Sequence, residues 1–376
     1  MPISQFRKPL LPSHYSIWVD PPDEAGDEVL HIVSERRSLK LKGHSFREFR
    51  KNVIPLLDGS HTLEEIQNAT QTIFRPEDLS ECLGLLGDQG IIVEAEGTAT
   101  PAVDRLLPQL NFFHDVAPGA NLHNRLMNAT VAVIGLGGAG AAAALSLGAA
   151  GIGAVRCIDS SPVSAADLYF SPWLASGHPG SSRAGTVAIL LNAAAPEVKV
   201  LVHEQPLESE EQIRAAIHGA GMVVCCLDAS QSNLIFKLNR VCLADNIQWI
   251  SCSLGGAEII VGPAVQPGHS PCYLCFRMRA VACAGNPEEA FAYERYLDRR
   301  KHDDSARREN LVFSAGIAAN LLGIEVVKQL TGLSEPSLVG RILTIRLTDL
   351  SIERHTILRK PWCPACFSGA EAAHAD

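Results

Sequence analysis

The stretch Thr130-Val-Ala-Val-Ile-Gly135-Leu-Gly-Gly-Ala-Gly140 decides the fold of this chain. Its first five residues are continuously apolar, as in a parallel strand that is buried on both faces. An alanine-rich helix is predicted to start near Ala139 and to run to Ala150. Glycines between such a strand and helix let the backbone approach a phosphate, which the helix N-terminus attracts. We therefore predict a Rossmann-like doubly wound α/β sheet, with nucleotide-binding residues Gly135, Gly137, Gly138 and Gly140.

Two acids follow later apolar runs. The run Ala154–Ile158 ends at Asp159, at the spacing where an acid binds ribose hydroxyls. The run 222–227 ends at Asp228, and a further strand is predicted at 248–252. Because parallel strands end at one edge of a sheet, the two acids predict a rim that binds nucleotide and metal. Either acid could instead cap a helix.

A dehydrogenase would carry a similar glycine turn. Against that class stand the doubled glycine Gly137-Gly138 and the lack of an obvious hydride-site histidine, because His123 and His178 are isolated along the chain.

Two cysteine pairs, Cys272-x-x-Cys275 and Cys363-x-x-Cys366, have the spacing of zinc knuckles. Compact zinc ribbons separate their pairs by about 15–20 residues. The separation here is far longer, so a structural zinc ion would join two distant loops. The alternatives are two disulfides or two unrelated turns, whereas redox chemistry would need one pair alone.

Composition limits the classes of protein. The 376 residues are 47% hydrophobic, enough for one large domain and a smaller one. The net charge of −9 disfavours nucleic acid and anionic membranes as partners. The sequence has no transmembrane-length apolar run and no signal-peptide pattern at its start. Most of the remaining cysteines stand singly in apolar runs, which is typical of a reduced, cytoplasmic protein.

Residues 1–97 have the pattern of a small winged-helix domain. Three short strands are predicted at 15–19, 28–33 and 38–42, and three helices follow. Thr62 and Glu65 have the spacing of a capping box at the second helix. A linker and connecting helix at 98–128 then lead to the nucleotide-binding domain at 129–376.

The segment from Arg36 to Lys51 is basic. It could be a solvated face, a site that recruits an acidic peptide, or, least favoured, a DNA-binding face. A small sheet with an exposed edge can accept an extended peptide as an added strand. The candidate peptide-binding residues are Leu39, Leu41, Leu79, Leu83 and Leu86.

Residues 131–367 resemble the ThiF-like, ubiquitin-activating-enzyme superfamily, whose members adenylate a C-terminal carboxylate with ATP. The matching motifs are Gly135-x-Gly-Gly-x-Gly140, Ile158-Asp159, Cys226-Leu-Asp228, Gly262-Pro-x-x-x-Pro267-Gly and both cysteine pairs. With its N-terminal domain, the chain resembles adenylating enzymes of microcin C maturation. It also resembles leader-peptide-binding proteins of thiazole/oxazole-modified microcin pathways, which partner YcaO-type cyclodehydratases. The resemblance implies ATP, magnesium, structural zinc and a homodimer.

The sequence departs from that superfamily where active members contact the triphosphate. Their Asn-x-x-Arg element is Asp167-Leu-Tyr-Phe170 here, and their Gly-x-x-Lys is Gly180-Ser-Ser-Arg183. Phe170 cannot offset phosphate charge, and arginine changes the geometry of the second cation. The resemblance leaves Asp228 and Arg183 as candidate catalytic residues, with Arg183 also a nucleotide contact.

Two hypotheses for the function remain, apart from an unrelated ThiF-like role. The favoured one is a maturation protein for modified peptide natural products (RiPPs), which binds the precursor's leader peptide and recruits it to a YcaO-type cyclodehydratase. In the other, the chain is itself an ATP- and magnesium-dependent enzyme that adenylates or modifies the peptide.

Overall fold

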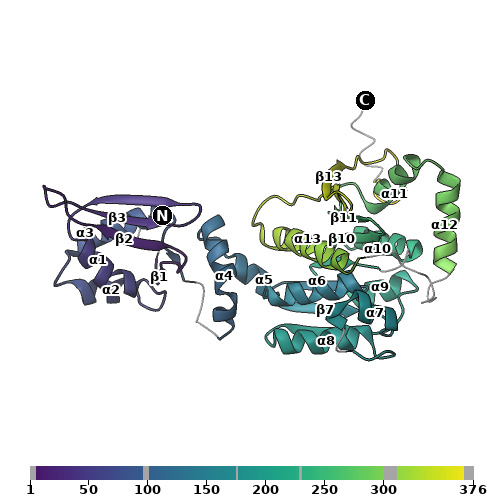
Figure 1. Cartoon of the computed structure of the whole chain (residues 1–376), viewed down its shortest axis with the longest axis horizontal. Coiled ribbons are helices and arrows are strands. Elements are labelled where there is room, and N and C mark those ends of the chain that lie inside the picture. The colour runs from purple at the N-terminus through teal and green to yellow at the C-terminus, as the bar shows by residue number, and fades with distance from the viewer. Residues whose placement is uncertain (1–5, 96–100, 175–176, 228–230, 300–310, 368–376) are drawn as a thin grey trace. The chain divides into compact units, whose positions relative to one another are not determined.

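The computed structural model describes residues 6–95, 101–174, 177–227, 231–299 and 311–367 (Figure 1). Contacts divide the chain into two compact units, Met1–Asn124 and Arg125–Asp376. We call them the N-terminal and C-terminal units and describe each by itself.

The N-terminal unit contains a three-stranded antiparallel sheet in the order β2-β3-β4. Its core side chains lie on one face of the sheet, where Ile17, Ile32 and Leu39 are paired across the strands. Helices fill the other side of this core, and the short strands β1 and β5 pair with each other. The elements are β1 (Pro9–Leu10), β2 (Ser16–Asp20), β3 (Glu28–Val33), β4 (Ser38–Gly43), α1 (Phe46–Asn52), η2 (Ile54–Leu56), α2 (Leu63–Thr70), α3 (Pro76–Asp88) and β5 (Val93–Glu94).

Helix α4 (Pro101–Val116) is counted with the N-terminal unit. Asp115 near its end accepts a hydrogen bond of 2.7 Å from Ser34 Oγ, and Asn111 donates to Ser13. The stretch that the sequence suggests as a linker is therefore, at α4, attached to the strands before it. The boundary found by contacts falls within α5 (Leu122–Met127).

The C-terminal unit is built on an eight-stranded sheet in the order β13-β12-β11-β10-β9-β6-β7-β8. Strands β8, β7, β6, β9 and β10 are parallel, and β11 to β13 continue the sheet antiparallel. The predicted α/β fold with a largely parallel sheet is confirmed. The strands are β6 (Thr130–Ile134), β7 (Ala154–Ile158), β8 (Lys199–His203), β9 (Met222–Cys225), β10 (Gln248–Gly255), β11 (Glu258–Val265), β12 (Arg341–Arg346) and β13 (Ser351–Thr356).

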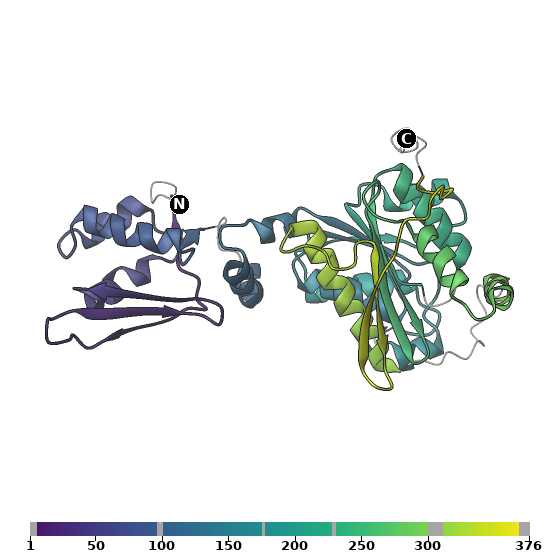
Figure 2. The same ribbon diagram turned by 90° about the horizontal axis from the view of Figure 1, so that it is seen from above.

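Helices cover both faces of this sheet (Figures 1 and 2). Val131 and Val133 of β6 pack into one core with α6, α8 and α13, whereas Ala132 and Ile134 pack into another with α9, α10 and α11. Burial on both faces explains the continuous apolar run of β6. The helices are α6 (Gly138–Ala149), α7 (Ala165–Phe170), η3 (Pro172–Leu174), α8 (Arg183–Ala194), α9 (Glu210–Ile217), α10 (Ser232–Ala244), α11 (Tyr273–Ala282), α12 (Pro287–Arg299) and α13 (Val312–Thr331).

Among the described residues, the helices are all too short or too polar to span a bilayer.

Candidate functional site

The glycine turn joins the end of β6 to the start of α6. Gly135 has a φ of +81°, and a Cβ there would lie 2.4 Å from the carbonyl oxygen of Cys226. A Cβ on Gly140 would lie 1.7 Å from the carbonyl oxygen of Gly135. Gly137 and Gly138 are the N-cap and first residue of α6. Both Gly135 and Gly140 are thus required by the packing of the turn itself, whatever ligand it binds.

Asp159 lies directly after β7 and is bound to this turn. Its Oδ2 accepts the Leu136 N–H at 2.7 Å, and its Oδ1 accepts the Ser161 N–H at 2.7 Å. The side chain is 7% exposed. The acid that the sequence predicts as a ribose ligand therefore already holds two backbone donors.

Arg183, the first residue of α8, is buried between two carboxylates. Its Nε and Nη2 donate to Asp167 at 3.0 and 2.8 Å, and its Nη1 lies 3.7 Å from Asp159 Oδ2. Asp167 also accepts the N–H and hydroxyl of Ser164, the N-cap of α7. The guanidinium that the sequence suggests as a triphosphate contact is thus engaged within the protein.

Sequence reasoning missed Asp167 as the partner of Arg183. The available signal was a pair of departures from the superfamily pattern: Asp167 adds a negative charge where an asparagine is usual, and Arg183 offers a two-pronged cation where a lysine is usual. Asp228 lies outside the described residues, and so does the side chain of Phe170. Their roles remain predictions.

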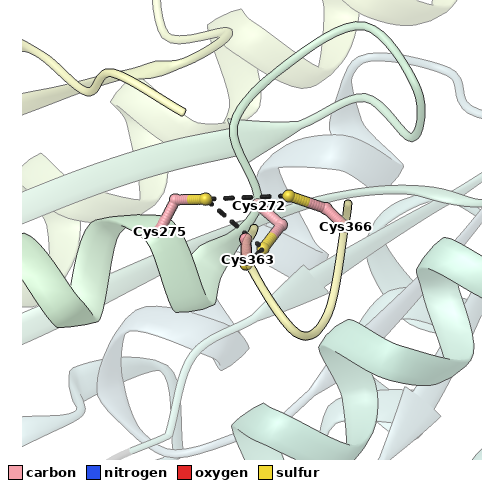
Figure 3. Close-up of side chains that lie close together, drawn as sticks. All are labelled: Cys272, Cys275, Cys363 and Cys366. Carbon is pink, nitrogen blue, oxygen red and sulfur yellow. Dashed lines mark hydrogen bonds between the residues drawn. The ribbon is translucent and has the colours of Figure 1, made fainter. Parts of the chain in front are cut away.

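The four predicted cysteine ligands come together in the C-terminal unit (Figure 3). Cys272 and Cys275 lie at the start of α11, and Cys363 and Cys366 lie after β13. The Sγ atoms of Cys272 and Cys363 are 3.7 Å apart, and those of Cys275 and Cys366 are 3.6 Å apart. Four thiolates at the usual zinc–sulfur distance have sulfur separations of about 3.8 Å.

The arrangement does not fit the disulfide alternative. All four cysteines are free, and a disulfide would bring two sulfurs to about 2 Å. Burial raises the pKa of Cys272 to about 11. Burial alone would also raise the pKa of Cys363, but hydrogen bonds from the backbone of Ala365 and Cys366 and from the thiols of Cys275 and Cys366 together outweigh it and lower that pKa. The Lys360 N–H also points at Cys275 Sγ, at 3.3 Å. A buried set of four thiols with N–H donors fits a closed structural zinc site.

Strand β4 lies at an edge of its sheet, because its one neighbour among the described strands is β3. Leu39 and Leu41 face the core from this strand, and Lys40 and Lys42 lie exposed on the opposite face. The three candidate leucines of α3 are at most 2% exposed, which places them inside the core rather than along a groove: Leu79, Leu83 and Leu86. The surface that β4 offers is therefore its backbone and its lysines.

Several cations of the basic segment have acidic partners within the N-terminal unit. Lys42 Nζ lies 2.9 Å from Asp23, and Arg47 lies 3.3 Å from Glu28. Neighbouring acids thus offset part of the basic segment.

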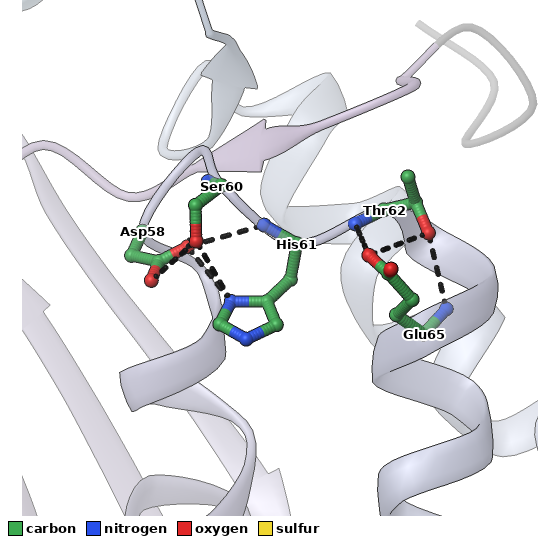
Figure 4. A network of polar contacts seen from close by, with 5 residues as sticks. All are labelled: Asp58, Ser60, His61, Thr62 and Glu65. Carbon is green, nitrogen blue, oxygen red and sulfur yellow. Dashed lines mark hydrogen bonds and ion pairs between the residues drawn. The ribbon is translucent and has the colours of Figure 1, made fainter. Parts of the chain in front are cut away.

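The turn at residues 58–65 is structural (Figure 4). Asp58 accepts hydrogen bonds from the backbone and hydroxyl of Ser60 and contacts His61 Nδ1 at 3.0 Å. Burial alone would raise the pKa of Asp58, but these hydrogen bonds outweigh it and lower that pKa strongly. Thr62 and Glu65 form the predicted capping box of α2, which is confirmed.

A largely parallel sheet with a glycine turn, an acid after the next strand and four cysteines that could hold a metal ion define a Rossmann-like α/β protein. A model of the ThiF family matches residues 107–365, and the chain belongs to this family. HesA of Nostoc sp. (strain PCC 7120) is 26% identical over 261 residues, which cover 69% of this chain and 92% of HesA. The sulfur carrier protein ThiS adenylyltransferase of Escherichia coli (strain K12) is 23% identical, over 64% of this chain and 87% of that protein.

Solved structures extend the likeness over nearly the whole chain. E. coli MccB with the peptide MccA-N7isoAsn has a TM-score of 0.65 at 19% identity, covering 96% of this chain and 99% of MccB. PaaA has a TM-score of 0.65 at 17% identity, covering 92% and 99%. At these identities the likeness concerns the fold.

Proposed function

We propose that this ThiF-family protein binds a RiPP precursor by its leader peptide and supports the precursor's ATP-dependent modification. The observation that carries the proposal is the exposed edge of β4 in the N-terminal unit. In support, the fold matches MccB over 96% of this chain, and MccB structures hold MccA peptides.

The leader peptide would add to the sheet as a strand beside β4. Backbone N–H and C=O groups from Ser38 to Gly43 would provide the ladder, as in other cases of strand addition. Lys40 and Lys42 lie exposed on one face of this edge. An acidic leader segment would complement them, although Lys42 is already paired with Asp23 and Asp27.

The modification itself would be carried out by a separate YcaO-type cyclodehydratase. The C-terminal unit supports this assignment because Arg183, the cation nearest to Asp159 in the described ion pairs, is bound to Asp167. Phosphoryl and adenylyl transfer depend on cations that meet the phosphate charge. The protein would then act by raising the local concentration of peptide near its partner.

Zinc and a second copy of the chain complete the proposed assembly. The cysteine cluster would hold one structural zinc ion. Helix α13 exposes Phe313 by 72% and Ile324 by 53%, which supports the predicted homodimer through this helix.

The second candidate function is an adenylating enzyme with ATP and magnesium. It is favoured by the intact glycine turn with Asp159, and by relatives that include the ThiS adenylyltransferase and MccB, which has been solved with ATP. In that case Asp228 would bind the metal and Arg183 would contact the nucleotide.

Pyrophosphate and phosphate release from the purified full chain distinguishes the two functions. With precursor peptide and magnesium ATP, we expect no turnover by the chain alone and turnover when the cyclodehydratase is added. Turnover by the chain alone, lost in Asp228→Ala, would establish the adenylating enzyme instead. Failure of the full chain to bind the precursor at all would refute both functions.

A further inference from the structure

Three charged side chains form a buried cluster beside the glycine turn: Asp159, Asp167 and Arg183. Arg183 joins the two acids, by a bidentate contact with Asp167 and a 3.7 Å approach to Asp159. Each of the three side chains is less than 10% exposed. We call this set the Asp159–Arg183–Asp167 cluster.

The cluster is connected to the backbone of three segments. Asp159 accepts the N–H of Leu136, which lies within the glycine turn. Asp167 accepts the N–H of Ser164 at the start of α7, and Arg183 begins α8. The cluster therefore fixes the positions of the turn, α7 and α8 relative to one another through hydrogen bonds of this chain.

The charge of the cluster works against a triphosphate. Two carboxylates and one guanidinium give a formal charge of −1. A bidentate carboxylate occupies the guanidinium fork that would otherwise match phosphate oxygens. Buried charges are weakly screened, so an anion placed beside this cluster is repelled more than it would be at the surface.

We propose that the Asp159–Arg183–Asp167 cluster holds the glycine turn in its ordered shape without a nucleotide and makes the site discriminate against nucleoside triphosphates. Asp167 is the specificity-determining residue, because it removes the guanidinium of Arg183 from any phosphate. The inference deepens the proposed recruiting function and rests on it, since it explains how a ThiF-family unit persists as a scaffold.

Asp167→Asn tests the inference, because it removes one charge and keeps the shape of the side chain. Calorimetric titration with magnesium ATP should show weak or undetectable binding to the wild-type full chain. The variant should bind magnesium ATP at least about tenfold more tightly, because the carboxylate that occupies the guanidinium fork of Arg183 is removed. Without nucleotide its melting temperature should fall by about 5 °C or more, because a buried cation loses its bidentate carboxylate.

Asp245→Asn is the matched control in the same unit. Asp245 makes a 2.8 Å ion pair with Arg214, away from the turn and partly exposed. The control should leave the affinity for magnesium ATP unchanged. If the Arg183–Asp167 pair were purely structural, Asp167→Asn would have a lower melting temperature but the same affinity for magnesium ATP as the wild type. That result would overturn the inference.

A second variant covers the case in which Asp167→Asn does not fold. The double variant Asp167→Asn with Arg183→Lys also lacks the bidentate ion pair, and it should show the same gain in affinity for magnesium ATP. Tight binding of magnesium ATP by the wild type, or a folded double variant with no gain, would overturn the inference. Precursor-peptide binding is measured on the same preparations. If the peptide still binds, only the inference about nucleotide discrimination has failed, and the proposed recruiting function stands.

Discussion

The edge of β4 and the glycine turn use their charged groups in opposite ways. At β4, Lys40 is exposed and the strand has a neighbour on one side among the described strands. At the glycine turn, Arg183 and Asp159 are buried, and both are bound by groups of this chain. The N-terminal unit thus has an exposed strand edge, whereas in the glycine turn the N–H of Leu136 is already bound by Asp159 and the nearby Arg183 by Asp167.

The glycine motif alone is weak evidence for a bound nucleotide, because the turn needs its glycines without one. Gly135 and Gly140 are required because Cβ atoms there would collide with backbone carbonyl oxygens. Their presence follows from the strand-to-helix turn itself. Evidence for nucleotide binding must therefore come from the charged groups around the turn, and two of these, Asp167 and Arg183, are residues in which the sequence departs from its superfamily.

The largest expected effect comes from removing one ligand of the cysteine cluster. All four cysteines lie in the C-terminal unit, so the loss of stability should be confined to that unit. Cys363→Ser should reduce bound zinc from about one per chain to none, and destabilise the C-terminal unit by about 5 kcal/mol or more, because metal binding energy is folding energy. Elemental analysis and thermal unfolding measure both. Cys283→Ser, at an exposed cysteine, is the control. Metal-free wild type with unchanged unfolding would refute the zinc site.

The next effect tests whether the glycines serve the fold. Gly140→Ala should destabilise the C-terminal unit by about 3 kcal/mol in the absence of nucleotide, because its Cβ would collide with the Gly135 carbonyl oxygen. Gly323→Ala in α13 is the control, since a Cβ there meets nothing within 4 Å. It should be neutral or stabilising by up to about 1 kcal/mol. Urea unfolding measures both; equal stabilities would mean that Gly140 is not required by packing.

A third effect concerns the edge of β4. Leu41→Pro should weaken binding of the precursor peptide by at least about tenfold, because proline removes a ladder donor and distorts the strand. Ile17→Pro places the same change on β2, the opposite edge of the same sheet. Both side chains face the core, so loss of packing is similar. Fluorescence anisotropy with labelled peptide should separate the two variants, and equal losses would argue against binding at β4.

Much of the fold could be predicted because local patterns determine it. The runs at β6, β7, β9 and β10 are apolar, as strands that are covered on both faces of a parallel sheet require. Strand β8 was missed because this edge strand, Lys199–His203, mixes polar and apolar residues. Strands β11 to β13 were missed as well: Gly262 and Pro263 interrupt the apolar run of β11, and β13 is mostly exposed.

In the candidate sites, too, features set by a local motif could be predicted, and those that depend on packing could not. Each cysteine pair is a local motif, so the two candidate ligands of a pair could be predicted from their spacing, whereas the meeting of the two pairs depends on the fold. The pairing of Arg183 with Asp167 joins residues from α7 and α8, and depends on how those helices pack. The leucines of α3 were assigned to a groove, but helical spacing alone does not distinguish a core face from a groove wall, and the structure places them in the core.

The smallest expected effect concerns the exposed charge of Lys40 at the edge of β4. Lys40→Glu should slow association with an acidic leader peptide and weaken binding by about threefold at low salt, because exposed charges act mainly on the association rate. The difference should shrink as salt is raised, since screening shortens the reach of surface charges. Lys199→Glu, on an exposed position of β8, changes the net charge equally and should leave the association rate near the wild-type value. Stopped-flow fluorescence at two salt concentrations measures both variants. Equal slowing would assign the effect to net charge, whereas slowing confined to Lys40→Glu would place the peptide at β4.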